Sequence, residues 1–286
     1  MSDTVKPRRR SREERLGRIL GLLVSKGSIA VSDIAHELEV STASIRRDLQ
    51  ALEMQHLLVR THGGAVAQGV TYELPLRYRS GRQEIEKRAI AAEAARRVPA
   101  GRGTVGLTGG TTTTEVARRL FDHADLTVVT NAINIASELV VRENIRLVVT
   151  GGVARPQSYE LVGPLAEASL AGLNLDVAFL GVDGVAATAG LTTHQEMEAH
   201  TNSVLLARAR SVVVVADSSK LGRTAFARIS PLDAVDELIT DWEADPECVA
   251  ELREAGLRVT LVDRPSGGDG VPDRSTKADD GDPDAD

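Results

Sequence analysis

The sequence predicts a two-domain protein, with an N-terminal winged helix-turn-helix followed by an α/β domain that has a mostly parallel sheet. Three observations support this fold class. The chain has 286 residues, which is enough for two domains. Near the N-terminus, short amphipathic helices lead into a strand and a Gly-Gly turn. Beyond residue 83, continuous Val- and Leu-rich strands alternate with helices, which is typical of a parallel sheet covered on both faces.

The composition excludes several classes of protein. Aromatic residues make up only 2% of the chain, so the core is built from aliphatic residues and a stacking platform for single-stranded nucleic acid is not expected. The single cysteine, Cys248, excludes an internal disulfide and a Cys-based zinc site. No apolar run reaches the roughly 18 residues of a membrane span, and the N-terminus lacks the apolar segment of a secretory signal. We therefore expect a soluble cytoplasmic protein without a membrane partner.

Charge is distributed unevenly along the chain, which has a net charge of −7. Residues 1–64 hold 11 Lys and Arg against 8 Asp and Glu, whereas the tail from Asp263 holds 8 Asp against 3 Lys and Arg. A basic N-terminal region on an acidic protein suggests that this region binds a polyanion. The alternative is a basic terminus that is simply solvated.

The first 64 residues contain the signals of three helices and a wing. Apolar residues recur at helical spacing from Leu16 to Leu23. Ser41 can cap a later helix, because its hydroxyl can accept a hydrogen bond from an N-terminal backbone N–H group. The expected elements are a helix that ends at Gly27, a helix over about residues 32–38, a helix from Ser41 to about Gln55, a strand over residues 57–61 and a turn at Gly63-Gly64.

Strand and helix signals alternate through the rest of the chain, after a helix over residues 83–97. The expected strands are residues 104–108, 126–130, 145–150, 176–182, 211–217, 237–240 and 258–262. The tail is rich in Gly, Pro and Asp and is expected to be disordered. The expected organisation is a disordered basic arm (1–10), a winged helix-turn-helix (11–67), a linker (68–82), an α/β domain (83–262) and a disordered acidic tail (263–286).

The third helix separates into a buried stripe and an exposed basic face when it is rotated by 100° per residue. Ile45, Leu49 and Leu52 fall on the buried side. The opposite face holds Ala43, Arg47 and Gln50, with Arg46 on one flank and Ser44 and Asp48 on the other. Such a face can lie in the major groove of double-stranded DNA, where Arg bonds guanine and Gln bonds adenine.

Neighbouring residues suit contacts with the DNA backbone. Ser41, Thr42 and the N-terminus of the third helix can hold a phosphate. Arg60 and His62, on the wing, can reach the backbone or the minor groove. Taken alone, Arg46 and Arg47 could form a solvated face paired with acidic neighbours. Together with the helix spacing, the turn, the wing and the basic arm, they favour binding to double-stranded DNA.

The stretch VSTASIRRDLQALE (40–53), followed by LVRTHGGA (58–65), closely resembles the N-terminal domain of DeoR-type transcriptional regulators. The resemblance continues to residue 262. It implies that residues 31–50 are a DNA-reading helix-turn-helix. It also implies a transcriptional repressor, usually of genes for the uptake and catabolism of a carbon source.

Polar residues gather at the ends of predicted strands, where open α/β sheets bind ligands. Gly109, Gly110, Thr111, Thr112 and Thr113 join a strand to a helix, and a helix N-terminus can bind an anion. Further polar residues at strand ends or on a helix between strands are Thr130, Asn131, Gly151, Gly152, Asp183, Glu198, Asp217, Ser219 and Lys220. Fixed donors with a cation suit a phosphate, and the carboxylates and amide suit sugar hydroxyls. For any single turn, the alternative is that these residues only form an ordinary loop between a strand and a helix.

The second half of the chain resembles the DeoR C-terminal sensor domain, which is similar in fold to ribose-5-phosphate isomerase and glucosamine-6-phosphate deaminase. This resemblance implies that the effector is a phosphorylated sugar or a related metabolite, and that the phosphate loop is residues 110–113. Two positions depart from the family pattern. Thr108 stands where the family often has Asp, and Asn202 stands where it often has Lys. These departures remove an acceptor and a cation, and they argue against isomerase chemistry.

We therefore expect a repressor of genes for carbohydrate uptake and catabolism, released from its DNA operator by a phosphorylated sugar. No catalytic residue, metal or cofactor is expected. A palindromic or repeated operator needs at least a dimer, so a homodimer or homotetramer is expected. Two alternatives stay open. One is a sugar-phosphate isomerase or deaminase with a DNA-binding head, and the other is a regulator that responds to a nucleotide or a polyol.

Overall fold

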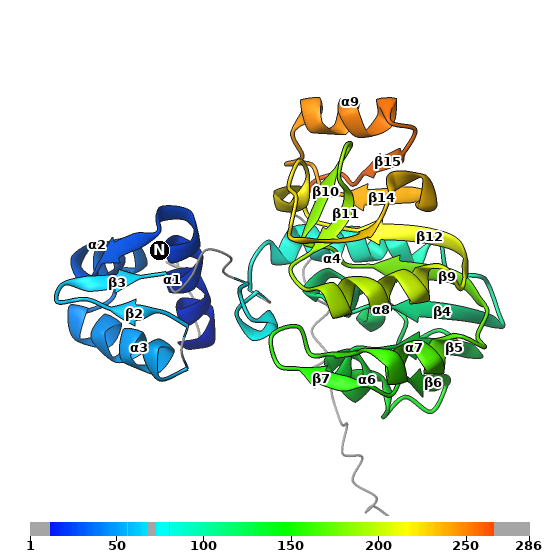
Figure 1. Ribbon diagram of the computed structural model, residues 1–286, viewed down its shortest axis with the longest axis horizontal. Helices are drawn as coiled ribbons and strands as arrows, with labels where there is room; N and C mark the ends of the chain where they lie inside the picture. Colours follow the sequence, from blue (N-terminus) through cyan, green and yellow to red (C-terminus); the bar gives the residue numbers. More distant parts are fainter. Residues whose placement is uncertain (1–11, 56, 68–72, 80, 266–286) are drawn as a thin grey trace, which may run out of the picture.

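The computed structural model describes residues 12–55, 57–67, 73–79 and 81–265 of the chain. The expected basic arm and nearly all of the expected acidic tail lie outside these ranges. The described residues form two bodies that lie side by side and are joined by a short connecting segment (Figure 1). Within the described residues, no helix combines the length and the apolar character needed to cross a membrane.

The first body is a winged helix-turn-helix, as the sequence predicts. Its elements are α1 (Arg12–Lys26), β1 (Ser28–Ala30), α2 (Val31–Leu38), α3 (Thr42–Met54), β2 (Val59–Arg60) and β3 (Gly64–Val66). Strand β1 was not predicted, and it pairs antiparallel with β3 to give a sheet of order β1-β3-β2. The strand predicted over residues 57–61 is shorter, and Gly64 belongs to β3 and not to the turn, because it pairs with Ala30.

Local chemistry fixes the start and the buried side of α3. The backbone N–H of Ser44 donates to Ser41 Oγ at 3.2 Å, so Ser41 is the predicted N-cap. Ile45, Leu49 and Leu52 are fully buried, as the rotation predicts, and they pack with apolar residues of α1 and α2 in one core. The exposed face of α3 is therefore set by burial of the opposite stripe.

The second body is built on a seven-stranded parallel sheet of order β15-β14-β12-β9-β4-β5-β6. Its strands are β4 (Gly103–Leu107), β5 (Leu126–Thr130), β6 (Ile145–Val149), β9 (Leu175–Leu180), β12 (Ala209–Val215), β14 (Glu237–Thr240) and β15 (Arg258–Leu261). The seven predicted strand runs thus form one sheet, and each predicted run lies within two residues of its observed bounds.

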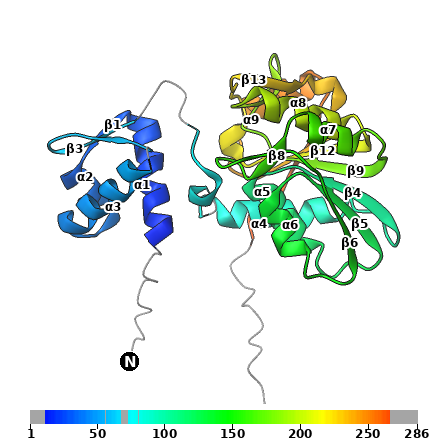
Figure 2. The same cartoon turned by 60° about the horizontal axis from the view of Figure 1, so that its bottom comes forward.

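Helices cover both faces of this sheet (Figure 2). Successive side chains of β9 point to opposite faces of the sheet. Val177 and Phe179 belong to one hydrophobic core, and Ala178 and Leu180 belong to the other. The first core contains residues of α4 (Glu84–Ala95), α5 (Thr111–Arg119) and α6 (Ile133–Leu139). The second contains residues of α7 (Pro164–Leu170), α8 (Glu196–Leu206) and α9 (Pro246–Glu254).

Shorter elements connect the main strands and helices. A hairpin follows β6, and a small antiparallel sheet has the order β10-β11-β13. The elements are β7 (Val153–Arg155), β8 (Glu160–Val162), β10 (Gly184–Ala186), β11 (Gly190–Thr193), β13 (Ala227–Ser230) and the 3₁₀ turns η1 (Leu76–Tyr78), η2 (Ser218–Lys220) and η3 (Leu232–Ala234).

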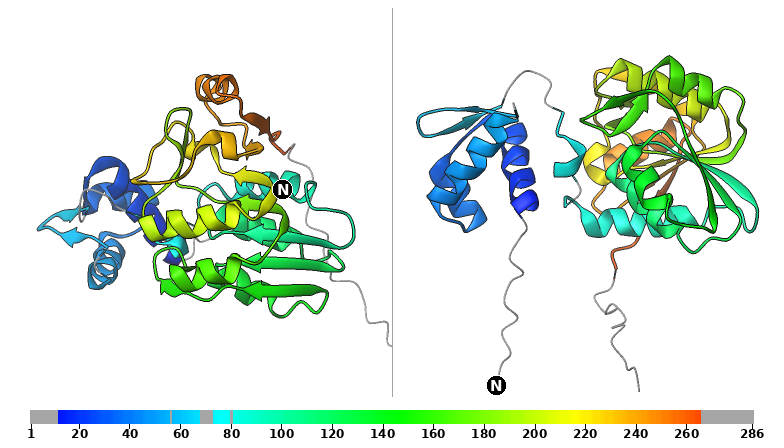
Figure 3. Two further views of the ribbon diagram at one scale, coloured as in Figure 1. Left: turned by 45° about the vertical axis from the view of Figure 1, so that its right-hand side comes forward. Right: turned by 90° about the horizontal axis from the view of Figure 1, so that it is seen from below.

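The connecting segment around η1 touches both bodies. Leu74 and Tyr78 are buried in the core of the first body. The backbone N–H of Leu76 donates to the backbone oxygen of Gln157, in the β7–β8 hairpin of the second body, at 2.7 Å. Figure 3 shows this cyan segment between the two bodies.

The wing geometry can be tested at its two adjacent glycines. A Cβ on Gly64 would lie 2.1 Å from the backbone oxygen of Ile29, so Gly64→Ala must push β1 and β3 apart. We expect it to lower the free energy of unfolding of the first body by about 1–3 kcal/mol.

Gly63→Ala is the matched control, because nothing lies within 4 Å of its added Cβ. Its effect should stay within about 0.5 kcal/mol. Urea denaturation combined with hydrogen exchange in β1 and β3 measures both variants. Equal stability of the two would contradict the close contact in the wing.

Candidate nucleic-acid interface and candidate ligand site

The outer face of α3 carries exposed basic residues without acidic partners. Arg46, Arg47 and Gln50 are exposed, as are the residues at the helix start. Among the residues that the structure describes, neither arginine forms an ion pair, and Arg47 makes only a long hydrogen bond of 3.4 Å from its guanidinium to Ser44 Oγ. This face can therefore offer two guanidinium groups to a polyanion.

The acidic residue of α3 is held on the other side of the helix. The sequence places Asp48 on an exposed flank, but the structure buries it, with 2% of its surface exposed. Arg15 Nε of α1 lies 2.6 Å from one carboxylate oxygen of Asp48, and Arg12 Nε lies 3.5 Å from the other. Because Asp48 is occupied by α1, it does not neutralise Arg46 or Arg47.

The predicted wing residues lie beside α3. The Arg60 guanidinium is 3.5 Å from the Glu53 carboxylate, which also accepts the backbone N–H of Arg60 at 3.2 Å. This contact holds β2 against the end of α3. His62 is exposed in the loop between β2 and β3. Both side chains therefore lie on the surface of the wing.

A small pocket opens at the carboxyl ends of the parallel strands, at the start of α5. Gly110 has φ 135° and precedes α5, and no side chain caps this helix. The first backbone N–H groups of α5 thus lack a side-chain acceptor, and they give a helix N-terminus its affinity for anions. The pocket has a volume of about 110 Å³, and the predicted site residues that line it are Gly110, Thr111, Thr112, Asp217, Ser219 and Lys220.

Four cations that the sequence did not single out also line this pocket. They are Arg79, Arg82, Lys87 and Arg223. Together with Lys220, they place five positive side chains around a space that borders a helix N-terminus. The chemistry of such a site is that of an anion receptor.

The titration of Lys87 reflects this crowding. Its ammonium is buried, donates to the backbone oxygens of Arg79 at 3.3 Å and Arg82 at 2.5 Å, and lies 3.8 Å from Asp217. Burial lowers the pKa of Lys87 to about 8, and the charges of Lys220, Arg82 and Arg79 add to this effect against the attraction of Asp217. A bound anion would relieve the repulsion among these cations.

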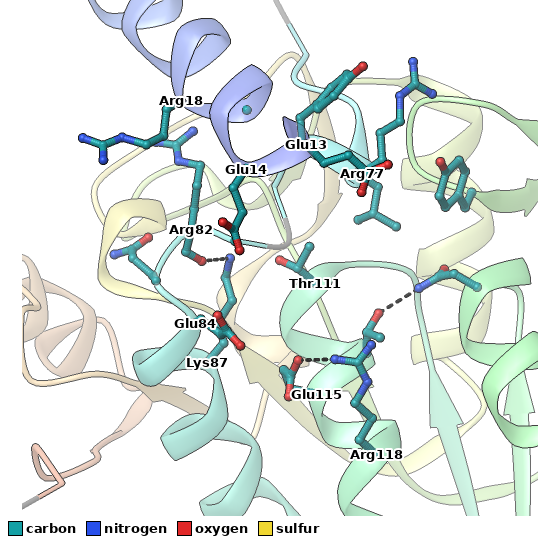
Figure 4. Close-up of a pocket in the computed structure, with 18 of the residues that line it drawn as sticks. Glu13, Glu14, Arg18, Arg77, Arg82, Glu84, Lys87, Thr111, Glu115 and Arg118 are labelled. Carbon is teal, nitrogen blue, oxygen red and sulfur yellow. Dashed lines mark hydrogen bonds and ion pairs between the residues drawn. The ribbon is translucent and has the colours of Figure 1, made fainter. Parts of the chain in front are cut away.

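A second and larger pocket adjoins the first one. It has a volume of about 930 Å³ and lies between α1, the connecting segment and the helices α4, α5 and α6. Lys87, Arg82 and Thr111 line both pockets. Figure 4 shows Lys87 beneath the backbone oxygen of Arg82, with Thr111 beside them and Glu14 approaching from α1. A ligand anchored in the small pocket would therefore face the space between the two bodies.

Two predicted carboxylates lie in a charged cluster next to the pocket. Asp183 accepts from the Arg79 guanidinium at 3.1 Å and lies 3.4 Å from the Lys220 ammonium. Burial alone would raise the pKa of Asp183, but the charges of Arg79 and Lys220 lower it to about 2. Thr193 Oγ1 lies 3.0 Å from Asp183 and 2.6 Å from Glu198, so the two carboxylates share one hydroxyl. Burial raises the pKa of Glu198.

Asn202, one of the two departures from the family pattern, belongs to a fully buried polar cluster. Its amide donates to a Glu160 oxygen at 3.4 Å, and it accepts from Asn131 at 3.2 Å. The same Glu160 oxygen accepts the Gly109 N–H at 2.6 Å. Burial, and then the charge of Glu198, raise the pKa of Glu160 well above its usual value. A neutral Asn202 therefore faces a carboxyl group that favours its neutral form.

The remaining predicted residues do not line the small pocket. The Thr130 hydroxyl donates to the backbone oxygen of Leu107 at 2.8 Å, and the Thr113 hydroxyl donates to that of Gly110 at 3.0 Å. Gly151 and Gly152 lie against α7, after the edge strand β6. These residues shape the loops at the strand ends, whereas the Gly109 N–H is already taken by Glu160.

The residues that sequence reasoning missed come mainly from the connecting segment and from α4. Arg79 and Arg82 lie where the chain has no periodic pattern, and Lys87 lies on a helix that carries several other charges. The one available signal is the density of basic residues between Arg77 and Arg88. That signal cannot tell which of them turn inward.

Comparison with known proteins identifies both domains. Residues 15–69 match the DeoR-like helix-turn-helix domain, and residues 82–242 match the DeoR C terminal sensor domain. The chain is 38% identical over 254 residues to the HTH-type transcriptional regulator GlpR of Haloferax volcanii, covering 87% of this chain and 97% of that protein. It is 32% identical over 223 residues to the glycerol-3-phosphate regulon repressor of Escherichia coli K12, covering 78% and 88%.

Among solved structures, ribose 5-phosphate isomerase from Plasmodium falciparum matches with a TM-score of 0.35 and 17% identity, covering 48% of this chain and 52% of that one. A likeness at this level has no bearing on function. The matched domains and the curated relatives are those of transcriptional regulators and not of enzymes. The chain is therefore a DNA-binding transcriptional regulator that belongs to the DeoR family.

Proposed function

We propose that this regulator is a repressor of genes for carbohydrate uptake and catabolism and that a phosphorylated sugar releases it from its operator. The observation that carries the effector class is the small pocket at the start of α5. Five cations surround an uncapped helix N-terminus there, next to the carboxylates Asp183 and Glu198. Cations with backbone N–H groups suit a phosphate, and the carboxylates suit sugar hydroxyls.

The operator contacts follow from the exposed face of α3. Arg47 and Gln50 are proposed to read base edges in the major groove, with Ala43 and Ser44 allowing close approach. Ser41, Thr42, Arg60 and His62 are proposed to contact the DNA backbone, and Arg46 flanks the groove. The proposed DNA-binding domain is residues 11–67 and the proposed sensor domain is residues 83–262. A homodimer or homotetramer would present two such faces to a palindromic operator.

Fluorescence anisotropy on the DNA upstream of this protein's own gene tests the proposal. At fixed salt, sugar phosphates, their unphosphorylated polyols and nucleotides are added one at a time. Release by a sugar phosphate alone supports the proposal. Release by the polyol or by a nucleotide would show that the effector is not a phosphorylated sugar. Binding no tighter than to random DNA would show that the upstream DNA is not the operator.

Arg47→Ala should relax the preference for one operator base pair at a cost of about 1–3 kcal/mol in binding free energy, because a bidentate contact to guanine is lost. Arg60→Ala should weaken binding to all sequences and reduce the slope of affinity against salt by about one. Arg119→Ala, exposed on α5, is the control and should bind as the parent chain does. A uniform loss in Arg47→Ala would contradict the groove assignment.

Lys220→Ala should abolish the response to the effector and leave operator affinity unchanged, because Lys220 lines the anion pocket of the second body, whereas α3 belongs to the first. Lys220→Arg keeps the positive charge and should retain part of the response. Isothermal titration calorimetry with the effector, together with anisotropy on the operator, measures both. An unchanged response in Lys220→Ala would remove this residue from the site.

Phosphate binding should weaken as pH rises through the pKa of Lys87. Burial lowers this pKa to about 8, and an anion stabilises the charged form, so affinity is highest below pH 8 and falls above it. Between pH 7 and pH 9 the dissociation constant should rise about tenfold, because roughly one tenth of the ammonium stays charged one unit above its pKa.

Phosphate monoesters are already ionised near pH 6, so they contribute little over this interval. Lys87→Arg keeps its charge throughout and should give a nearly flat profile between pH 7 and pH 9. Calorimetry in buffers of matched ionic strength measures the profile. A steep rise in the dissociation constant of Lys87→Arg would assign the titration to another group.

A further inference from the structure

The connecting segment, residues 73–79, belongs to both bodies at once. Its apolar residues Leu74 and Tyr78 are buried in the core of the first body. Its contact with α1 is close, because a Cβ on Gly17 would lie 2.5 Å from the backbone oxygen of Tyr78. The Tyr78 hydroxyl also donates to Gln55, just after α3, at 2.8 Å. Any shift of this segment must therefore be transmitted to the helices that carry the DNA-binding face.

The charged residues at the two ends of the same segment belong to the cluster around Asp183 and Glu198. Glu73 accepts from the Arg155 guanidinium at 2.8 Å and from Arg79 at 2.9 Å. Arg79 in turn donates to Asp183, and Arg155 donates to Glu198 at 2.9 Å. All five side chains are at most 18% exposed. The segment thus supplies Arg79, which balances Asp183, and Glu73, which pairs with the same Arg155 that balances Glu198.

An effector must disturb this balance in order to bind. Its hydroxyl groups would need Asp183 and Glu198, whose carboxylates are occupied by Arg79 and Arg155. Arg79 also lines the small anion pocket, so a phosphate there would attract it away from Glu73. Lys87 holds the backbone oxygen of Arg79, and a phosphate would compete for its ammonium as well.

We propose that residues 73–79 compete with the effector through their ion pairs: Glu73 and Arg79 pair with Arg155 and Asp183, and an anion that draws Arg79 into the small pocket breaks these pairs, releases the segment and so repositions the DNA-binding domain. This inference rests on the proposed function of the pocket. By linkage, a segment that favours the DNA-binding form must weaken effector binding by the same factor as the effector weakens DNA binding. Loosening the segment should therefore act like the effector on DNA and strengthen effector binding.

Hydrogen exchange on the unaltered protein tests the displacement directly, with inorganic phosphate as the probe. The N–H groups of Leu76, Tyr78 and Arg79 are hydrogen-bonded in the docked segment. Saturating phosphate should speed their exchange by about fivefold or more, the lower end of ordinary coupling factors. The α3 core amides should stay protected. Unchanged exchange at the three amides would overturn the proposal.

Two variants test separately the contact of the segment with the charged cluster and its contact with α1. Glu73→Gln removes the charge that holds Arg155 and Arg79, so phosphate should bind about fivefold or more tighter and operator affinity should fall by a similar factor. Gly17→Ala places a Cβ against Tyr78 within a helix that favours Ala, so phosphate should still displace the segment but lower operator affinity less than in the parent chain.

Gly21→Ala is the matched control for Gly17→Ala. It lies one turn further along α1, and its added Cβ would be 3.7 Å from the Arg82 side chain, which is ordinary contact. It should keep the full effect of phosphate on operator affinity. Loss of coupling in both glycine variants would overturn the proposal, and so would weaker phosphate binding by Glu73→Gln.

The failure of this inference can be distinguished from the failure of the proposed function. If calorimetry shows that phosphate does not bind, or that Lys220→Ala binds it as well as the parent chain does, the anion pocket itself is wrong. If phosphate binds through Lys220 but exchange in residues 76–79 is unchanged, the pocket stands and the competing segment is wrong.

Discussion

The arrangement of the second body depends on how buried charge is balanced at the carboxyl ends of its parallel strands. Charged side chains in a site of low dielectric are stable only when they are paired. Here Asp183 is balanced by Arg79 and Lys220, whereas Asp217 lies opposite Lys87. Because positive groups outnumber negative ones around the small pocket, an anion of modest size completes the balance. The connecting segment takes part in this balance, because its Arg79 pairs with Asp183 and its Glu73 pairs with Arg155.

Parallel topology brings these residues together. The loops after β4, β9 and β12 lie far apart in sequence but meet at one edge of the sheet, since all seven strands run in the same direction. The two helical layers bury both faces of the sheet, so the strand ends are the place where polar groups can gather. Glu160 is the extreme case, because its complete burial favours the neutral carboxyl group and suits an uncharged neighbour at position 202.

In the first body, a buried ion pair leaves nearby positive charges on the surface without an acidic partner. Asp48 is held inside by Arg15 and Arg12 of α1, and this leaves Arg46 and Arg47 unopposed on the outer face of α3. Apolar packing therefore fixes which face of α3 is buried, and the ion pair with α1 keeps the carboxylate of Asp48 away from the exposed face. The connecting segment adds Leu74 and Tyr78 to the same core, and its Arg79 pairs with Asp183, so it joins the body that carries α3 to the charged cluster of the second body.

The sequence by itself determined the three helices of the first body and the seven strands of the main sheet, because these elements depend on local signals. Helical spacing placed Ile45, Leu49 and Leu52 inside, Ser41 marked the start of α3, and apolar runs located every strand of the main sheet. Glycine and threonine after a strand marked the start of α5, where we propose an anion site.

Only the tertiary structure decided which charges meet there. No local pattern predicts that Arg79, Lys87 and Glu73 point inward. Their partners Asp183, Asp217 and Arg155 lie far away in the sequence. Burial of Asp48 likewise required α1 to supply its partners. Local sequence fixes which face of a helix is apolar, but long-range contacts fix which charges are paired and which are left for a ligand.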